Sequence, residues 1–175
     1  AQGCRRIGFL GARMDPRVQR RLQGYQNAMK SAGLFDPRLI VTTAVPTSTT
    51  MGGSLFSDLM LRAPDVDAVF CANDDLALGV LFECQRRHIA VPEQIAIVGF
   101  NDMEFMASAV PTLTSVRTNR YEMGLRAATM IMDEIEGRPV AERVVDLGFE
   151  VMERQSSQQR HAVAPAADRV SGTKW

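Results

Sequence analysis

The chain has 175 residues, of which 46% are hydrophobic and 23% charged, a composition typical of a globular domain with one core. Twenty basic residues balance twenty acidic ones, so the net charge of zero excludes a broad basic surface for nucleic acid. Three cysteines are too few for a disulfide framework, and Cys71 and Cys84 lie in apolar patterns typical of buried thiols in a reducing cytoplasm. No basic-then-apolar leader and no long apolar run occurs, so neither export nor a membrane partner is expected.

Short apolar runs and amphipathic stretches alternate along the first part of the chain. Residues 6–11 predict a buried strand that ends in glycine. Residues 18–32 predict a helix, because their apolar side chains recur at steps of three and four. A weaker strand is expected over residues 39–41, and a second helix over residues 51–62.

The same alternation continues through the middle of the chain. Residues 67–72 predict another buried strand, followed by a helix that starts around residue 74 and ends near residue 87. We expect an aspartate to be the N-cap of this helix. Residues 95–100 predict a fourth strand.

The last predicted elements are an extended segment, a helix, a strand and a tail. Residues 114–116 are extended, and residues 121–136 form a helix that ends before Gly137. This helix is expected to point Leu125, Ala128, Met132 and Ile135 inward. Residues 143–147 predict a final strand, and the polar residues 155–175 predict a disordered tail.

This order of elements predicts the fold class. Strands that alternate with helices require an α/β fold, in which a doubly wound, mostly parallel sheet carries helices on both faces. No internal repeat and no Gly/Ser linker divides the chain, so residues 1–154 are expected to form one unit.

Motifs that would indicate catalysis are absent from the sequence. There is no Gly-x-Ser-x-Gly elbow, no phosphate-binding loop of the Walker type and no Gly-x-Gly-x-x-Gly after a strand. His88 and His161 are far apart, and no His/Cys spacing suits zinc. Asp74 and Asp75 are conceivable metal ligands, but their place at a helix start favours capping. We therefore expect a protein that is not an enzyme and needs no cofactor.

Polar residues follow several predicted strands at the point where each strand ends. Arg13, Asn73, Asn101 and Thr118 follow the first, third, fourth and fifth extended segments. In open α/β sheets, ligands bind at the carboxyl ends of the strands. These side chains are therefore expected to line one crevice.

Arg21 is the most informative of the candidate binding residues. It lies on the same helical stripe as Val18 and Tyr25, so it leans toward the protein. It also lies near a helix N-terminus, and its planar guanidinium suits a carboxylate. The alternative is a solvated arginine beside a core stripe, just as Asn73 is alternatively a simple helix cap.

Four segments in this order resemble the lac-repressor family of transcription regulators. Val69–Gly79 resembles the family's AND-x-x-A-x-G segment, and Val91–Asp102 resembles its VP-x-D-I-x-V-G-F/Y-D/N-D strand. Pro111–Val116 is similar to its P-x-L-T-T-V crossover, and Arg21–Tyr25 to its effector-contacting helix. The resemblance covers roughly residues 4–150.

Three further segments resemble the gluconate-utilisation repressors within this family. They are Leu10–Asp15, Phe82–Arg86 and Asp146–Phe149. The family resemblance implies a helix-turn-helix head, a hinge and a core of two α/β subdomains with the effector between them. Residues 1–154 then correspond to the C-terminal subdomain, and the head and the N-terminal subdomain are expected to be absent from this chain.

The resemblance also implies roles for the candidate binding residues. Arg21 takes the place of the family's effector-binding arginine, and Asn73 that of the asparagine in the AND segment. Asn101 stands where many sugar-binding members have an aspartate. An amide donates hydrogen bonds to an anion that a carboxylate would repel, so the expected effector is a sugar acid such as gluconate.

Excess hydrophobicity predicts a partner surface. Leu78 and Phe82 lie off the apolar stripe of their helix, and the loop after residue 100 contains Met103, Phe105 and Val110. Exposed apolar patches usually mark an interface, and family members bind operator DNA as homodimers through their heads. The alternative is that the loop folds back on its own core.

Other functions remain open at the level of sequence. An exported solute-binding protein shares the architecture, although the missing leader and the unpaired cysteines disfavour it. An enzyme of the doubly wound class would need a catalytic set that is not visible. A cytoplasmic repressor is therefore the favoured prediction.

Overall fold

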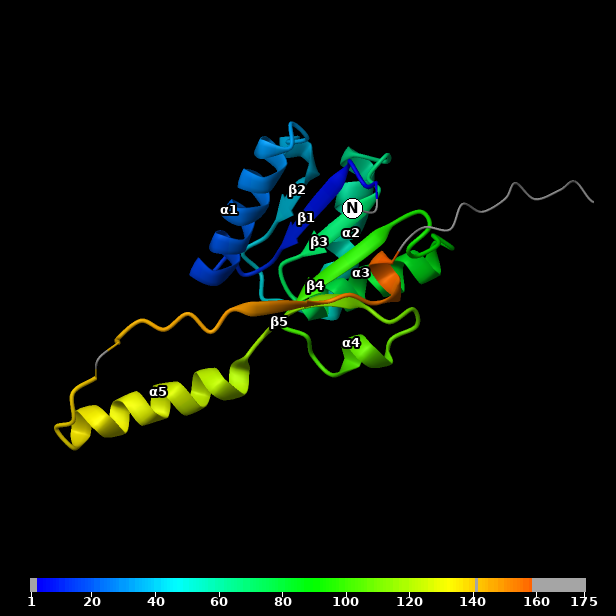
Figure 1. Ribbon diagram of the computed structural model, residues 1–175. Coiled ribbons are helices and arrows are strands. Elements are labelled where there is room, and N and C mark those ends of the chain that lie inside the picture. Colours follow the sequence, from blue (N-terminus) through cyan, green and yellow to red (C-terminus); the bar gives the residue numbers. More distant parts are fainter. Residues whose placement is uncertain (1–2, 141, 159–175) are drawn as a thin grey trace, which may run out of the picture.

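The computed structural model describes residues 3–140 and 142–158, which build a six-stranded sheet of order β2-β1-β3-β4-β5-β6 (Figure 1). Strands β1 to β5 are parallel, and β6 is antiparallel to β5. The predicted mostly parallel α/β fold is thus confirmed. The strands are β1 (Ile7–Gly11), β2 (Ile40–Thr42), β3 (Ala68–Cys71), β4 (Ala96–Phe100), β5 (Thr114–Thr118) and β6 (Phe149–Met152).

Helices cover both faces of the sheet. On one face the Tyr25 ring of α1 lies 5.4 Å from the Phe9 ring of β1, between centroids. On the other face Gly8 makes room for Leu59 of α2. The α-helices are α1 (Pro16–Ser31), α2 (Thr49–Arg62), α3 (Asp74–Arg86), α4 (Phe105–Ser108) and α5 (Arg120–Ile135), and the short 3-10 helices are η1 (Pro37–Leu39) and η2 (Gln155–Ser157).

Helix α1 begins where the sequence provides a cap and ends after its apolar stripe. Asp15 accepts hydrogen bonds from the backbone N–H groups of Arg17 and Val18, and a proline occupies the first turn. The helix then buries Val18, Tyr25 and Met29 against the sheet. The Tyr25 hydroxyl donates to the Ile7 carbonyl at 2.6 Å, which satisfies its polar end within the core.

Helix α3 is capped by Asn73 and not by an aspartate. The Asn73 Oδ1 accepts a hydrogen bond from the Leu76 N–H at 3.1 Å. The Asp74 side chain is instead buried beneath the loop that follows β4, with 1% of its surface exposed. Cys84 of α3 and Cys71 of β3 are buried thiols as expected, and burial raises the pKa of Cys84 to about 12.

Helix α5 does not pack on the sheet, and the prediction that its apolar stripe points inward is wrong. No described residue of α5 is buried, and Leu125 and Ile135 are 50% and 73% exposed. Figure 1 shows the helix extending away from the body between β5 and β6. Helical periodicity indicates that one face becomes buried, but it does not indicate which surface covers that face.

The chain after α5 also differs from the prediction. The expected strand over residues 143–147 is wrong, because the last strand is Phe149–Met152. Residues expected to start the tail form η2 instead, and Ser156 is fully buried. Its Oγ donates to the Ile97 carbonyl and accepts from the Thr114 N–H. The prediction of a disordered tail from residue 155 is therefore wrong for residues 155–157, and the rest of the expected tail, residues 159–175, lies outside the described part.

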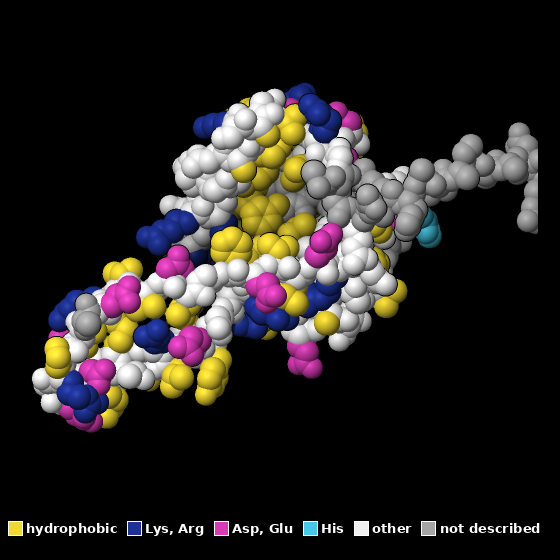
Figure 2. Space-filling view, in the orientation of Figure 1, with side chains coloured by type: hydrophobic (Ala, Val, Ile, Leu, Met, Phe, Trp, Pro, Cys, Tyr) yellow, Lys and Arg dark blue, Asp and Glu magenta, His cyan; other side chains and the backbone are white. Residues whose placement is uncertain are grey.

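One face of the sheet is only partly covered. Beside α1, hydrophobic side chains gather in a hollow of the surface (Figure 2). An apolar depression of about 560 Å³ lies on this face, and Phe70, Val98 and Val151 contribute to its lining. No helix in the described residues is long and apolar enough to cross a membrane.

Candidate functional site

Two loops at the carboxyl edge of the sheet adopt unusual backbone conformations. After β1, Arg13 and Met14 have φ values of 65° and 46°, and after β4, Asn101 and Asp102 have φ values of 117° and 52°. Non-glycine residues rarely adopt this left-handed region, although Asn and Asp tolerate it best. Such conformations cluster at binding sites, where they aim side chains at a ligand.

A depression of about 190 Å³ lies at this edge of the sheet. It brings together Arg13, Arg21, Asn73 and Asn101, which the sequence nominates as binding residues. Thr118 does not join them, since it lines a separate depression of about 480 Å³ between β5 and β6. The full lining of the first depression is Ala12, Arg13, Asp15, Arg17, Val18, Arg21, Thr47, Asn73, Asp75 and Asn101.

Arg21 is half-buried and held in a defined position. Its Nη1 donates to the Ala72 carbonyl at 2.6 Å, at the point where β3 ends. Its guanidinium carbon lies 3.7 Å from the centroid of the Phe100 ring, a cation–π arrangement. Burial, and next the charge of Arg17, lowers the pKa of Arg21 from its usual value, although it remains protonated at neutral pH. The negative charge of an anionic ligand would offset the free-energy cost of burying the charged guanidinium.

Asn73 has a structural contact on each end of its amide. Its Oδ1 caps α3, and its Nδ2 donates to the Thr47 Oγ at 3.1 Å. Asn73 is therefore a helix cap, as one of the two interpretations of the sequence predicted. The cap fixes the side chain in the lining of the depression, where its amide nitrogen contacts Thr47, another lining residue.

The charges around the depression favour an anion. Its lining contains Arg13, Arg17 and Arg21 against Asp15 and Asp75, which is three positive charges minus two negative charges, or +1. Asp15 is already engaged by Arg17 at 2.9 Å and by the start of α1. Within the described residues, no hydrogen bond is formed by the side chain of Asn101.

Sequence reasoning missed Thr47, Asp15 and Arg17 as lining residues. Thr47 follows β2, whose carboxyl end also meets this edge of the sheet. The missed signal was the polar stretch between the weak second strand and the next helix. Asp15 and Arg17 were missed because an aspartate before a helix is explained by capping alone.

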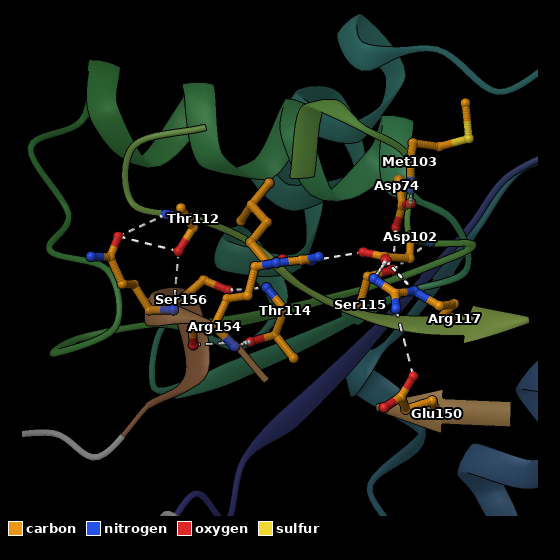
Figure 3. A network of polar contacts seen from close by, with 12 residues as sticks. Asp74, Asp102, Met103, Thr112, Thr114, Ser115, Arg117, Glu150, Arg154 and Ser156 are labelled. Carbon is orange, nitrogen blue, oxygen red and sulfur yellow. Dashed lines mark hydrogen bonds and ion pairs between the residues drawn. The ribbon is translucent and has the colours of Figure 1, made fainter. Parts of the chain in front are cut away.

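A second group of polar contacts joins the start of α3, the loop after β4 and strand β5 (Figure 3). The Asp74 carboxylate accepts hydrogen bonds from the Ser115 hydroxyl and the Met103 N–H, both at 2.7 Å. Burial raises the pKa of Asp74 above its usual value, and these hydrogen bonds oppose that effect. The Ser115 Oγ in turn accepts from the Asp102 N–H at 3.0 Å.

The residues predicted to form a partner surface differ in their exposure. Phe82, Met103 and Val110 are 47%, 40% and 78% exposed. Leu78 of α3 and Phe105 of the loop after β4 are partly buried and pack against the core. The packing of Phe105 shows that this loop does fold back in part onto the core. Gln85 of α3 donates to the Val110 carbonyl at 2.9 Å, which joins α3 and the loop into one surface.

A groove of about 590 Å³ adjoins this surface between α2 and α3, and Phe82 contributes to its lining. Glu83 lies in the groove, where the Arg87 Nε donates to it at 2.6 Å and Arg86 pairs with it. Among the described residues, no group of three or more His, Cys, Asp or Glu side chains lies together as a metal site would require.

A family model described as a periplasmic binding protein-like domain matches residues 1–157. The chain belongs to this family. The match extends over all six strands and includes both depressions at the carboxyl edge.

The similar periplasmic binding protein-like domains occur in transcription regulators. The HTH-type transcriptional regulator GntR of Pseudomonas aeruginosa is 45% identical over 157 residues, which cover 90% of this chain and 46% of that protein. The HTH-type transcriptional regulator IdnR of Escherichia coli is 39% identical over 150 residues, covering 83% and 43%. The chain spans about half the length of the curated relatives that it matches.

Solved structures lead to the same family. The crystal structure of the transcription regulator GntR from Chromobacterium violaceum superimposes with a TM-score of 0.87 at 46% identity, covering 89% of this chain and 58% of that one. The resemblance to lac-repressor-type regulators is thus confirmed, and these relatives are regulators rather than exported solute-binding proteins.

Proposed function

We propose that this chain is the effector-sensing part of a DNA-binding transcriptional repressor, and that its effector is a sugar acid such as gluconate. The observation that carries the proposal is the half-buried Arg21, which shares a depression with Asn73 and Asn101 at the carboxyl edge of the sheet. The names of the relatives support the regulatory role. In this proposal the chain acts by binding and not by catalysis.

The chemistry of the depression supports an acidic ligand. The guanidinium of Arg21 offers paired donors that match a carboxylate, and its contacts to Ala72 and Phe100 orient it beforehand. Asn101 offers an amide that donates to or accepts from ligand hydroxyls. A sugar acid presents both groups, a carboxylate and a row of hydroxyls.

The depression forms one wall of a larger site. Its volume of about 190 Å³ is smaller than the roughly 300–1,000 Å³ usual for a ligand pocket. We place the second wall and the operator-binding head in other parts of a longer cytoplasmic protein, with the sheet body of residues 1–154 as the C-terminal subdomain. Arg13 and Thr118 would then contact the ligand or the second wall.

The proposal includes a homodimer. Phe82, Met103 and Val110 provide exposed apolar area next to the groove between α2 and α3. A two-fold partner contact there would bring two DNA-binding heads to two half-sites of an operator.

The test is a calorimetric titration of the intact protein with gluconate. Arg21→Ala removes a charge-assisted pair worth about 1.5–3 kcal/mol, so gluconate affinity should fall at least tenfold. Arg20→Ala is the matched control, because Arg20 is the exposed neighbour on the same helix. Operator binding without gluconate should be preserved in both variants.

Two results would contradict the proposal. Equal gluconate affinity in the parent and in Arg21→Ala would show that the carboxylate is held elsewhere. Displacement of gluconate by an equal concentration of glucose would show that the site does not select an acid.

A further inference from the structure

Two successive peptide groups in the turn after β4 are fixed by hydrogen bonds to β5. The Asn101 N–H donates to the Val116 carbonyl at 2.9 Å, and the Asp102 N–H donates to the Ser115 Oγ at 3.0 Å. These peptide groups lie on either side of Asn101, and because peptide groups are planar, they set its backbone angles. The φ of 117° at Asn101 is a strained value that persists only where the surroundings hold it.

The Asp74 carboxylate, at the start of α3, holds the same turn from a second element. Its Oδ1 accepts from the Ser115 hydroxyl, and its Oδ2 accepts from the Met103 N–H, both at 2.7 Å (Figure 3). Because a carboxylate only accepts, it takes the one hydrogen of the Ser115 hydroxyl and leaves the lone pairs of that oxygen to the Asp102 N–H. A methyl group at position 99 would overlap the carboxylate, so Gly99 leaves the room that it needs.

Three arginines also contact Asp102, but at other atoms. Arg117 and Arg154 pair with its carboxylate, and Arg120 donates to its carbonyl at 3.3 Å. None of these three contacts involves the N–H groups on either side of Asn101. The arginines therefore restrain the side chain and carbonyl of Asp102 and leave the peptide groups beside Asn101 to the buried contacts with β5.

The direction of the Asn101 side chain follows from its backbone. Within the described residues, no hydrogen bond of its own holds this side chain, which is partly buried and lines the depression with Arg21 and Asn73. Asn73 directly precedes Asp74, whose side chain is 1% exposed and is not part of the lining. The start of α3 therefore presents one candidate binding residue and holds the turn that presents another.

We propose that Asp74 is a positioning residue of the binding site: through Ser115 and the Met103 N–H it fixes the turn that presents Asn101 to a ligand. A group that is already oriented loses less conformational freedom when a ligand binds. The identity of the ligand rests on the proposed function, whereas the hold of Asp74 on the turn does not depend on it.

Ser115 and Ser156 form a matched pair for a test without ligand. Both are fully buried, and Ser156 joins the same two strands near their amino ends, at Ile97 and Thr114. Hydrogen exchange is measured in the intact protein. The Asp102 amide should exchange faster by about tenfold or more in Ser115→Ala, and at the parent rate in Ser156→Ala. An unchanged rate in Ser115→Ala, or the same acceleration in both variants, would overturn the proposal.

Substitutions of Asp74 test the carboxylate itself. Asp74→Ala removes both acceptor oxygens, so the Asp102 and Met103 amides should both exchange faster. Asp74→Asn keeps one oxygen for the Met103 N–H, and this conservative variant should restore slow exchange at Met103. Parent-like exchange of both amides in Asp74→Ala would overturn the proposal. If Asp74→Ala does not fold, Ser115→Ala decides the test.

The gluconate affinity of the folded protein separates positioning from stability. Ser115→Ala should weaken gluconate binding about fivefold, the loss expected for one hydrogen bond between neutral groups. In an Asn101→Ala background the same substitution should change the affinity by less than about twofold, whereas in an Arg13→Ala background the loss should remain about fivefold. Equal losses in the two backgrounds would show a merely structural role and overturn the proposal.

The two proposals fail separately. If the parent does not bind gluconate but the exchange rates change as expected, the effector assignment fails and the hold of Asp74 on the turn at Asn101 stands. If gluconate binds and Ser115→Ala leaves both the exchange rates and the affinity unchanged, the effector assignment stands and the role of Asp74 fails.

Discussion

At the scale of single residues, Asn73 combines an observed structural contact with the binding role that we propose for it, and one substitution separates the two. Asn73→Asp retains the oxygen that caps α3 and loses the Nδ2 donor. Because Asn and Asp are equivalent N-caps, the free energy of unfolding should change by less than about 0.5 kcal/mol. Gluconate affinity should fall at least tenfold, since an added carboxylate repels the anion.

Urea denaturation and calorimetry of the intact protein check this prediction. Asn73→Ala is the companion variant, and it should lose about 1 kcal/mol of stability through the missing cap. Parent-like gluconate affinity in Asn73→Asp would place the ligand away from Asn73.

The sequence predicts residues of the candidate site only where it also indicates which strands are neighbours in the sheet. The ends of β1, β3 and β4 identify Arg13, Asn73 and Asn101, because neighbouring parallel strands end at the same edge. Thr118 was nominated by the same rule, yet β5 lies next to β6 and Thr118 lines the depression between them. The antiparallel β6 could not be anticipated, since its exposed residues lack the apolar pattern of a buried strand.

At the scale of elements, α3 and the loop after β4 form the surface that we assign to the partner. Phe82 is the best probe, because it is 47% exposed and its replacement does not open the core. Phe82→Glu in the intact protein should convert the dimer to monomers in sedimentation, since an interface excludes an unpaired charge. Leu61→Glu, at an 83% exposed position of α2, is the control and should leave the dimer intact.

A stable Phe82→Glu dimer would show that the contact lies elsewhere. Leu78 and Phe105 are poorer probes than the sequence suggests. Both pack partly against the core, so a charge at either position would also destabilise the fold.

The packing of a helix could be predicted where the apolar stripe in its sequence is the face that contacts the sheet. The helices α1 to α3 each carry one apolar stripe that does cover the sheet. Helix α5 has an equally clear stripe, but its place away from the sheet is decided by chain topology. Helix α4 was not predicted, because a four-residue helix has no period to read.

At the scale of the whole molecule, two apolar surfaces have no cover among the described residues. One is the partly open sheet face around Phe70 and Val98, and the other is α5, with Ile131 and Ile135 61% and 73% exposed. Exposed apolar patches often mark a surface that another part of a protein or a partner covers. Both surfaces are consistent with a chain that spans about half the length of its curated relatives.

The chain leaves the sheet after Thr118 and re-enters it at Phe149, beside Thr118, so the segment between them that carries α5 can be removed without moving either strand. Thr118 and Phe149 face each other across an antiparallel ladder, so a two-residue turn fits between them. Replacing residues 119–148 with Asn-Gly should leave a body that melts cooperatively and binds less of an apolar dye than the parent chain. Ending the chain at residue 118 instead should unfold it, because β6 and the buried Ser156 are lost. Non-cooperative melting of the hairpin variant would show that α5 supports the body; a cooperative transition would make these two positions a graft site for other inserted segments.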